Sequence, residues 1–219
     1  RASRPWVVAH LAQSIDGRIA LPDGTSRWIS GELDLDHTHR LRALVDAVVV
    51  GARTVEMDDP QLTVRRVEGD TPVRVVIDPD RRLSSTRQIF VDSSAPTLRV
   101  VCGEGDPAPG ELQLRRQRGD SPGGILSPVD LLTRLWERGI RQVLLEGGGV
   151  TVSRFLAAGC VDLLHLVIAP VMLGAGRPAI SLPEPLHVAL SDCPRPETSI
   201  ERLGDDWLLI SRLTSPAGG

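Results

Sequence analysis

Several features that define particular protein classes are missing or scarce in this 219-residue chain. No apolar run approaches the roughly 20 residues that a membrane-spanning helix requires. The first residues lack the apolar segment of a signal peptide, and they lack a starting Met, which fits processing or truncation. The formal net charge is −3, so the basic excess of nucleic-acid-binding proteins is absent. We therefore expect a cytoplasmic protein that binds neither membranes nor nucleic acid.

Metal-ligating and disulfide patterns are also missing. Cys102, Cys160 and Cys193 are odd in number and far apart, which is typical of reduced thiols in the cytosol. No Cys-x-x-Cys pair occurs, and the histidines form neither a His-x-Glu nor a His-Glu-x-x-His pattern. We therefore expect no structural or catalytic metal.

What the chain does contain is an ordinary globular composition, with 41% hydrophobic and 24% charged residues. Strand-like apolar runs alternate with helical patterns, which favours an α/β fold with a largely parallel sheet. The last strand-like runs have no helix between them, so antiparallel strands should complete the sheet. We expect residues 1–219 to form a single domain. The strand-like runs are 6–12, 47–50, 73–77, 98–102, 142–145 and 163–169, then 187–190, 200–203 and 207–213.

Three helices are predicted between these strands. The first follows helical spacing over residues 33–45, with acidic residues toward its start and arginines toward its end. Ser127 and Pro128 are typical of the cap and first residue of a second helix, which Gly139 ends. The third runs from about residue 150 to 158. Residues 103–124, apart from 112–117, are expected to form a surface loop or flap.

The most informative stretch is residues 48–65. An apolar run indicates a buried strand that Gly51 breaks, and a polar segment with Thr54, Asp58 and Arg65 follows. Open α/β sheets bind ligands just past the C-terminal ends of their strands, where these side chains are expected. A structural alternative remains open: a helical turn with Thr54 as N-cap that stops at Asp58-Asp59-Pro60.

A second stretch combines a charge with a glycine turn. Glu146 ends an apolar run, and Gly147-Gly148-Gly149 lead into the third helix. Backbone N–H groups at a helix start can hold a phosphate or pyrophosphate. The spacing matches neither Gly-x-Gly-x-x-Gly nor a P-loop, and a tight turn that needs glycine for packing is the alternative. Glu146 favours a ligand, because a charge at the end of a buried strand needs a partner.

Further stretches complete a resemblance. With Gln13-Ser14-Ile15-Asp16-Gly17-Arg18-Ile19-Ala20, Ser26-x-Trp28-Ile29-Ser30, His39-x-Leu41-Arg42 and Val161-Asp162…Ala169-Pro170-x-x-Leu173-Gly174, the chain resembles the pyrimidine reductases of riboflavin biosynthesis over nearly its whole length. These enzymes are related in fold to dihydrofolate reductase. The resemblance implies NADPH-dependent reduction of 5-amino-6-(5-phosphoribosylamino)uracil, with hydride transfer to C1′ of the ring-opened ribosyl imine.

The resemblance also implies roles for individual residues. Asp58 is the candidate for positioning and proton delivery, although it could instead only hold the cofactor. Arginines suit a ribose phosphate because guanidinium matches phosphate oxygens in pairs. The substrate positions are Ser26, Arg42, Leu62, Arg65 and Glu146, and the cofactor positions are Ala12, Trp28, Thr54, Asp58, Gly148, Gly149, Val150, Thr151 and Arg154.

Some features depart from the family or leave alternatives open. His10 stands where many members carry Lys, and the zinc signature of the deaminase domain that often precedes the reductase is absent. The chain is therefore expected to be a stand-alone reductase or half of a bifunctional protein. The same fold and cofactor could serve a pterin, a folate or a specialised metabolite. A non-catalytic protein that binds pathway metabolites is the other alternative.

Two expectations concern cofactor selectivity and assembly. Arg81 and Arg82 could bind the 2′-phosphate of NADPH, although Asp78 and Asp80 would repel it. The run 161–170 is apolar along both alternating faces, and an uncovered apolar sheet face becomes an association surface. Resembling reductases are homodimers, so we expect a two-fold dimer; coverage by residues 182–186 and the chain end is the alternative.

Overall fold

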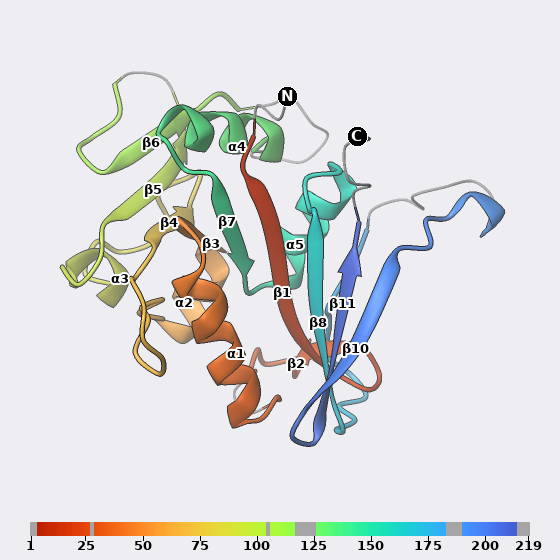
Figure 1. Cartoon of the computed structure of the whole chain (residues 1–219). Helices are drawn as coiled ribbons and strands as arrows, with labels where there is room; N and C mark the ends of the chain where they lie inside the picture. The colour runs from red at the N-terminus through yellow and green to blue at the C-terminus, as the bar shows by residue number, and fades with distance from the viewer. Residues whose placement is uncertain (1–3, 27–28, 104–105, 117–125, 183–189, 214–219) are drawn as a thin grey trace. The chain divides into compact units, whose positions relative to one another are not determined.

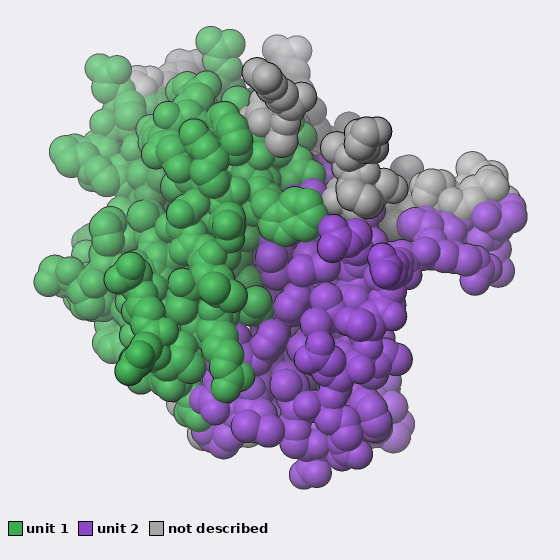
Figure 2. All heavy atoms as spheres, viewed as in Figure 1, with its two compact units in different colours: residues 1–6, 39–144 green, residues 7–38, 145–219 purple. Residues whose placement is uncertain are grey.

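A computed structural model describes residues 4–26, 29–103, 106–116, 126–182 and 190–213 (Figure 1). The chain forms two compact units, of which unit 1 comprises residues 1–6 and 39–144 and unit 2 comprises residues 7–38 and 145–219 (Figure 2). In the described part of the chain, no helix is long and apolar enough to cross a membrane.

Unit 1 is built on strands in the order β7-β3-β4-β5-β6. β3 pairs in parallel with β4 and β4 with β5, as the alternating pattern predicts. β5 also pairs in parallel with β6, a strand that was not among the predicted runs. Val48, Val49 and Val50 are fully buried, which explains why β3 is a continuous apolar run. The elements are β3 (Ala47–Gly51), α2 (Ala52–Asp58), β4 (Val73–Ile77), α3 (Gln88–Val91), β5 (Thr97–Cys102), β6 (Glu111–Leu114), α4 (Pro128–Glu137) and β7 (Gln142–Glu146, whose last two residues belong to unit 2).

Helix α4 forms as its local sequence predicts. The Ser127 hydroxyl accepts a hydrogen bond from the Asp130 N–H at 3.2 Å, and Pro128 occupies the first turn. Leu131, Leu132 and Leu135 are completely buried, so one apolar stripe fixes the orientation of the helix.

Unit 2 contains strands in the order β10-β11-β8-β1. β1 pairs in parallel with β8, whereas β8 with β11 and β11 with β10 are antiparallel, which confirms the predicted antiparallel end. A separate antiparallel pair is formed by β2 and β9. The elements are β1 (Trp6–Ser14), β2 (Arg18–Ala20), α1 (Glu32–Ala43, which continues into unit 1), α5 (Gly149–Ala157), β8 (Leu163–Ala169), β9 (Arg177–Pro178), a 3₁₀ turn (Leu190–Asp192), β10 (Glu197–Leu203) and β11 (Asp206–Arg212).

Some local predictions need correction. Thr54 is not an N-cap: α2 begins at Ala52, directly after β3, with Gly51 as a cap that makes no side-chain hydrogen bond. The predicted stop is confirmed, because Asp59 ends the helix with a left-handed φ of 40°. Most of the predicted run 187–190 lies outside the described residues, and Leu190 itself belongs to the 3₁₀ turn.

Candidate active site

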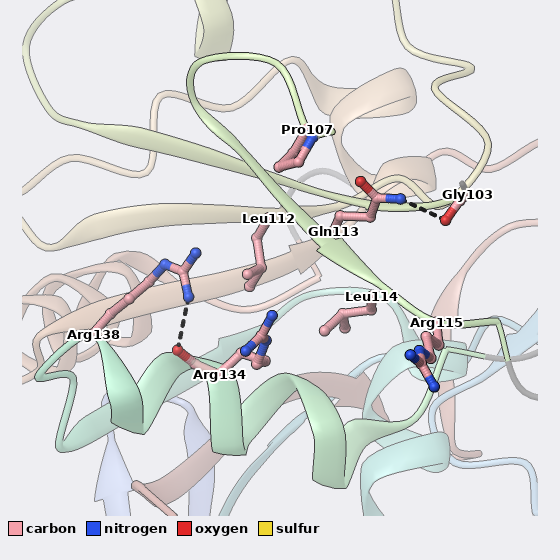
Figure 3. A pocket seen from close by; sticks show the side chains of 8 residues that line it. All are labelled: Gly103, Pro107, Leu112, Gln113, Leu114, Arg115, Arg134 and Arg138. Carbon is pink, nitrogen blue, oxygen red and sulfur yellow. Dashed lines mark hydrogen bonds between the residues drawn. The ribbon is translucent and has the colours of Figure 1, made fainter. Parts of the chain in front are cut away.

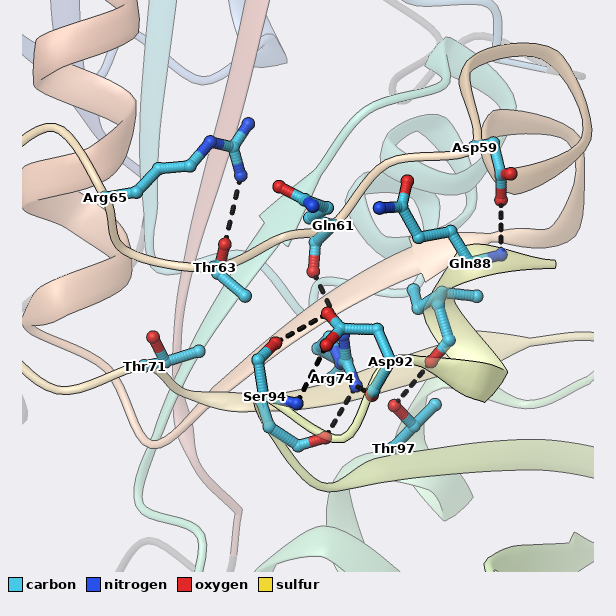
Figure 4. Close-up of polar contacts among 12 residues, drawn as sticks. Asp59, Gln61, Thr63, Arg65, Thr71, Arg74, Gln88, Asp92, Ser94 and Thr97 are labelled. Carbon is cyan, nitrogen blue, oxygen red and sulfur yellow. Dashed lines mark hydrogen bonds and ion pairs between the residues drawn. The ribbon is translucent and has the colours of Figure 1, made fainter.

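The loop from Asp59 to Arg65 carries two of the predicted substrate residues, Leu62 and Arg65. The Asp59 carboxylate accepts a hydrogen bond from the Gln88 N–H at 3.0 Å, which fixes the start of the loop (Figure 4). Leu62 has a φ of 55° and is only 2% exposed. A non-glycine residue in this left-handed region costs about 1–3 kcal/mol, so neighbouring contacts must hold it there.

The two arginines predicted to bind phosphate meet at one residue of this loop. Nη1 of Arg42, a buried side chain of α1, donates to the Thr63 carbonyl at 3.0 Å. Nη1 of Arg65 donates to the Thr63 hydroxyl, also at 3.0 Å (Figure 4). A guanidinium is planar and rigid, so these bonds fix the orientation of both groups beside the loop.

The remaining predicted residues of unit 1 lie on α2. Thr54 is half-buried within the helix, and Asp58 is exposed at its last residue. An exposed carboxylate at a helix end can move a proton to or from a ligand, as the predicted role of Asp58 requires.

Unit 2 carries the other predicted positions. Ala12 lies half-buried on β1, Ser26 is half-buried in the segment after β2, and Glu146 is half-buried at the end of β7. Trp28, a predicted cofactor position, lies outside the described residues.

The glycine turn between β7 and α5 is packed closely. Gly147 has a φ of 89°. A Cβ at Gly149 would lie 2.4 Å from the Ala179 carbonyl oxygen and 2.7 Å from that of Pro178. Gly149 is therefore required for packing, which was the structural alternative for this turn.

The start of α5 also fits the phosphate groups of a nucleotide cofactor. Its cap residue, Gly148, makes no side-chain hydrogen bond, and its first turn contains no acidic residue. The positive end of the helix dipole is thus neither capped by a side chain nor neutralised by a carboxylate within that turn. Val150 and Arg154 are exposed at and beyond this end.

The Ile15–Arg18 segment is hydrogen-bonded to the backbone of Leu173 and Gly174. The Asp16 carboxylate accepts hydrogen bonds from the Ser14 hydroxyl at 2.5 Å and from the Leu173 and Gly174 N–H groups at 3.1 and 2.6 Å. The Ser14 hydrogen bond, with these backbone bonds, lowers the pKa of Asp16 to about 2. Gly17 supplies the turn with a φ of 76°. Two of the stretches that carry the family resemblance therefore hold each other in place.

A buried histidine cluster in unit 2 was not predicted. His10 Nε2 lies 2.9 Å from Asp34 Oδ1, and His37 Nε2 lies 2.9 Å from His165 Nδ1. Burial, with the neighbouring His37 and His10, lowers the pKa of His165 to about 4. Burial raises the pKa of Asp34, but its hydrogen bond to His10 and the charge of His10 outweigh it and bring the pKa below its usual value.

The signal for this cluster was the spacing of Asp34 and His37, which share one face of α1. No strand pattern indicated that His10 and His165 would meet that face. Across the described ranges, no group of three His, Cys, Asp or Glu side chains is arranged to hold a metal ion.

Arg81 and Arg82 of unit 1, the predicted ligands of the 2′-phosphate of NADPH, differ in their surroundings. Arg81 forms two hydrogen bonds to Glu111, at 2.9 and 2.8 Å. Asp78 is fully buried and forms an ion pair with Arg99, so the arginine balances its negative charge within the unit. Arg82 is exposed, and its N–H donates to Asp78 at 3.0 Å.

A cavity of about 290 Å³ lies between β6 and α4 (Figure 3). None of the predicted site residues contributes to its walls. Its lining residues are Gly103, Pro107, Leu112, Gln113, Leu114, Arg115, Arg134 and Arg138.

Comparison with known proteins identifies the family. Residues 5–209 match the RibD C-terminal domain. The chain belongs to this family. It is 41% identical over 186 residues to the 2,5-diamino-6-ribosylamino-4(3H)-pyrimidinone 5′-phosphate reductase of Methanothermobacter thermautotrophicus, an alignment that covers 82% of this chain and 83% of the relative. It is 31% identical over 216 residues to the riboflavin biosynthesis protein RibD of Aquifex aeolicus, covering 94% of this chain but 57% of the relative.

Solved structures confirm the fold of this RibD C-terminal domain. The deaminase/reductase of Thermotoga maritima superposes with a TM-score of 0.78 at 30% identity, over 95% of this chain and 56% of that one. The Saccharomyces riboflavin biosynthesis reductase Rib7 gives 0.74 at 25% identity, over 97% and 91%. Dihydrofolate reductase of Enterococcus faecalis gives 0.54 at 14% identity, which supports the predicted fold alone. The chain thus spans little more than half the length of the bifunctional relatives.

Two further residues contact the loop of this RibD C-terminal domain. His39 Nδ1 accepts a hydrogen bond from the Arg65 N–H at 3.1 Å, and Arg74 Nη1 donates to the Gln61 carbonyl at 3.3 Å. His39 belongs to a stretch that carries the family resemblance, but nothing in the sequence assigned it a role. Arg74 gave no signal beyond a charge within an apolar strand.

Proposed function

We propose that this RibD C-terminal domain reduces a phosphoribosylaminopyrimidine with NADPH, and that 5-amino-6-(5-phosphoribosylamino)uracil is its substrate. The observation that carries the proposal is the meeting of Arg42 and Arg65 at Thr63. Two guanidinium groups fixed by the same residue form a preorganised site for one phosphate. An unphosphorylated pterin would leave this site unused.

The names of the relatives support the same substrate class. The archaeal relative is named for a ribosylaminopyrimidinone 5′-phosphate that carries a 2-amino group, whereas the Thermotoga protein is named for the corresponding uracil. Both names include a ribose phosphate. Following the resemblance, we assign Ser26 and Leu62 to substrate contacts and Glu146 to the N–H groups of the ring, which a carboxylate can accept.

We assign the pyrophosphate of the cofactor to the uncapped start of α5, and the rest of it to Ala12, Trp28, Thr54 and Asp58. When bound, NADPH supplies the hydride that the imine carbon accepts. Asp58 positions the reacting end of the substrate and delivers the proton. Arg42 and Arg65 hold the phosphate and thereby fix the distance of the reacting carbon from that anchor.

The test is substrate-dependent loss of NADPH absorbance with purified protein. Both pyrimidines, the uracil and its 2-amino counterpart, are compared with their dephosphorylated forms, and NADPH is compared with NADH. We expect turnover of the phosphorylated uracil with NADPH. Folded protein that consumes NADPH with neither phosphorylated pyrimidine would overturn the proposal, and metabolite binding that ignores NADPH would favour a sensor.

We also propose that the protein acts in the cytoplasm as a homodimer. Its three cysteines are free thiols, which suits a reducing compartment. Ile200 on β10 faces Leu209 on β11, which in turn faces Leu166 on β8, so these side chains form one apolar row. Ile200 is 62% exposed in the chain by itself. A second copy would cover this row.

A further inference from the structure

The loop from Asp59 to Arg65 is held by a fully buried arginine. Arg74 lies in β4 with no exposed surface. Its Nη1 donates to the Gln61 carbonyl at 3.3 Å and to Asp92 Oδ2 at 3.0 Å, and its Nη2 donates to the Asp92 and Ala95 carbonyls, each at 2.6 Å (Figure 4). One guanidinium thus joins the loop to the segment that precedes β5.

A buried guanidinium is a costly choice for a central strand. Val75 and Val76, its neighbours in β4, are also completely buried, and an apolar residue would satisfy the strand pattern. Burial of a charge is destabilising unless hydrogen bonds compensate, and Nε of Arg74 has no partner among the described residues. What an apolar residue could not do is hold the Gln61 carbonyl, directly before Leu62 with its left-handed φ of 55°.

His39 holds the other end of the same loop. It is 4% exposed on α1, and its Nδ1 accepts the hydrogen bond from the Arg65 N–H at 3.1 Å. An imidazole that accepts at Nδ1 carries its proton on Nε2. Nε2 lies 3.5 Å from Nη1 of Arg42, so two donors face each other and this contact is packing. The hydrogen bond through which His39 acts on the loop is therefore the one to the backbone of Arg65.

We propose that His39 and Arg74 are positioning residues that preorganise the loop for the ribose phosphate of the substrate. Arg74 fixes the backbone before Leu62, and His39 fixes the backbone of Arg65. Neither side chain contacts the substrate in this scheme. A loop already in its binding conformation avoids the entropy loss of ordering on binding, which otherwise weakens affinity. The inference rests on the proposed function, because that function is what assigns a phosphorylated substrate to the loop.

A matched pair of variants at His39 provides the first test. In His39→Asn, an amide oxygen near the Nδ1 position can still accept the Arg65 N–H. His39→Phe keeps a ring but removes the acceptor and leaves that N–H without its partner. We expect KM for the phosphorylated substrate to rise about tenfold in His39→Phe, with a smaller change in kcat and near wild-type KM in His39→Asn.

Arg74→Met tests the other end of the loop, and Asp92→Asn weakens the support of Arg74 without touching the loop. Both should raise KM more than they lower kcat. The control is Thr97→Val, which removes the hydrogen bond from the Thr97 hydroxyl to the Ile89 carbonyl at 2.8 Å in the same region (Figure 4). KM should not change in Thr97→Val. If Arg74→Met does not fold, the KM values of Asp92→Asn and of the two His39 variants test the inference instead.

A second readout does not depend on catalysis. Hydrogen exchange of the Arg65 amide should accelerate at least tenfold in His39→Phe and stay near wild type in His39→Asn, since only the former loses the acceptor. Wild-type KM and wild-type exchange in His39→Phe would overturn the inference and leave the proposed function intact. An inactive wild-type protein whose Arg65 amide is protected through His39 would instead overturn the proposed function.

Discussion

The two candidate ligand-binding segments are held in opposite ways. In unit 1, the loop that carries Arg65 is positioned by side chains, with Arg74 and His39 bonded to its backbone. In unit 2, the turn that leads into α5 depends on the absence of a side chain at Gly149, because that residue packs directly against two carbonyl oxygens. The first arrangement depends on hydrogen-bond chemistry and the second on volume.

This difference determines how each segment should respond to substitution. A hydrogen bond can be weakened, restored by an isostere or shared with water, so damage to the loop should be graded. A methyl group placed against backbone atoms has no such compensation, and the surrounding structure must shift. Substrate affinity and cofactor affinity should therefore separate experimentally.

The largest effect is expected for Arg65→Ala. Loss of a charge-assisted pair to the substrate phosphate should weaken transition-state binding by roughly 2–4 kcal/mol. The resulting fall in kcat/KM should come mostly from a higher KM. Steady-state kinetics with the phosphorylated pyrimidine measure this change. Arg66→Ala, at the neighbouring exposed arginine, is the matched control and should stay close to wild type. Equal turnover of the dephosphorylated substrate by wild-type protein would contradict the phosphate role.

Gly149→Ala should act on the other segment. A Cβ there would lie 2.4 and 2.7 Å from backbone oxygens, so we expect a loss of about 1–3 kcal/mol in the free energy of unfolding, together with weaker NADPH binding. Urea denaturation and an NADPH titration measure the two effects. Gly103→Ala is the control, because its added Cβ would meet no described atom closer than Arg81 Nη1, at 3.9 Å. Wild-type stability in Gly149→Ala would show that the close approach is not maintained in solution.

A change of pH should alter the free energy of unfolding by about as much as Gly149→Ala, through the histidine cluster of unit 2. The pKa of His165 is lowered from 6.5 to about 4, so the unfolded chain binds more protons between these values. Stability should therefore fall as pH falls from about 6.5 toward 4, by on the order of 2 kcal/mol. Urea denaturation of wild type and His165→Leu at several pH values measures it. The dependence should be weaker in His165→Leu; an identical slope in both proteins would place its origin in other groups.

Sequence reasoning succeeded where the determinants are local. Ser127 and Pro128 predict the start of α4 because a cap acts within one turn, and the apolar run of β3 reflects burial on both faces. Arg74 could not be predicted, since its partners Asp92 and Ala95 lie 18 and 21 residues away. Unlike a cap, a bond of that kind follows only from the tertiary fold.

The candidate site shows the same division. Arg42 and Arg65 were predicted from a specific family pattern, yet nothing in that pattern places both at Thr63. The left-handed conformation of Leu62 was also out of reach, because bulky residues rarely adopt it and no local signal marks it.

The smallest effect on the fold, and the last test of the comparison, concerns the apolar row of unit 2. Ile200 lies on β10, which ends the strand order, and it shares a face with Leu209. Ile200→Glu should change the free energy of unfolding of the isolated chain by less than about 0.5 kcal/mol, because the side chain is 62% exposed. In a dimer that covers this face, the same change buries an unpaired carboxylate and should dissociate the two copies.

Light scattering at micromolar concentration distinguishes these states. Wild type should give about twice the 23.6 kDa mass of the chain, and Ile200→Glu should give a single chain. Ser199→Glu is the matched control, since side chains alternate along a strand and Ser199 lies on the opposite face of β10. A monomeric wild type, or an Ile200→Glu protein that remains dimeric, would show that this row is not the interface. Retained kcat in a monomeric Ile200→Glu would further show that both ligand-binding segments work within one chain.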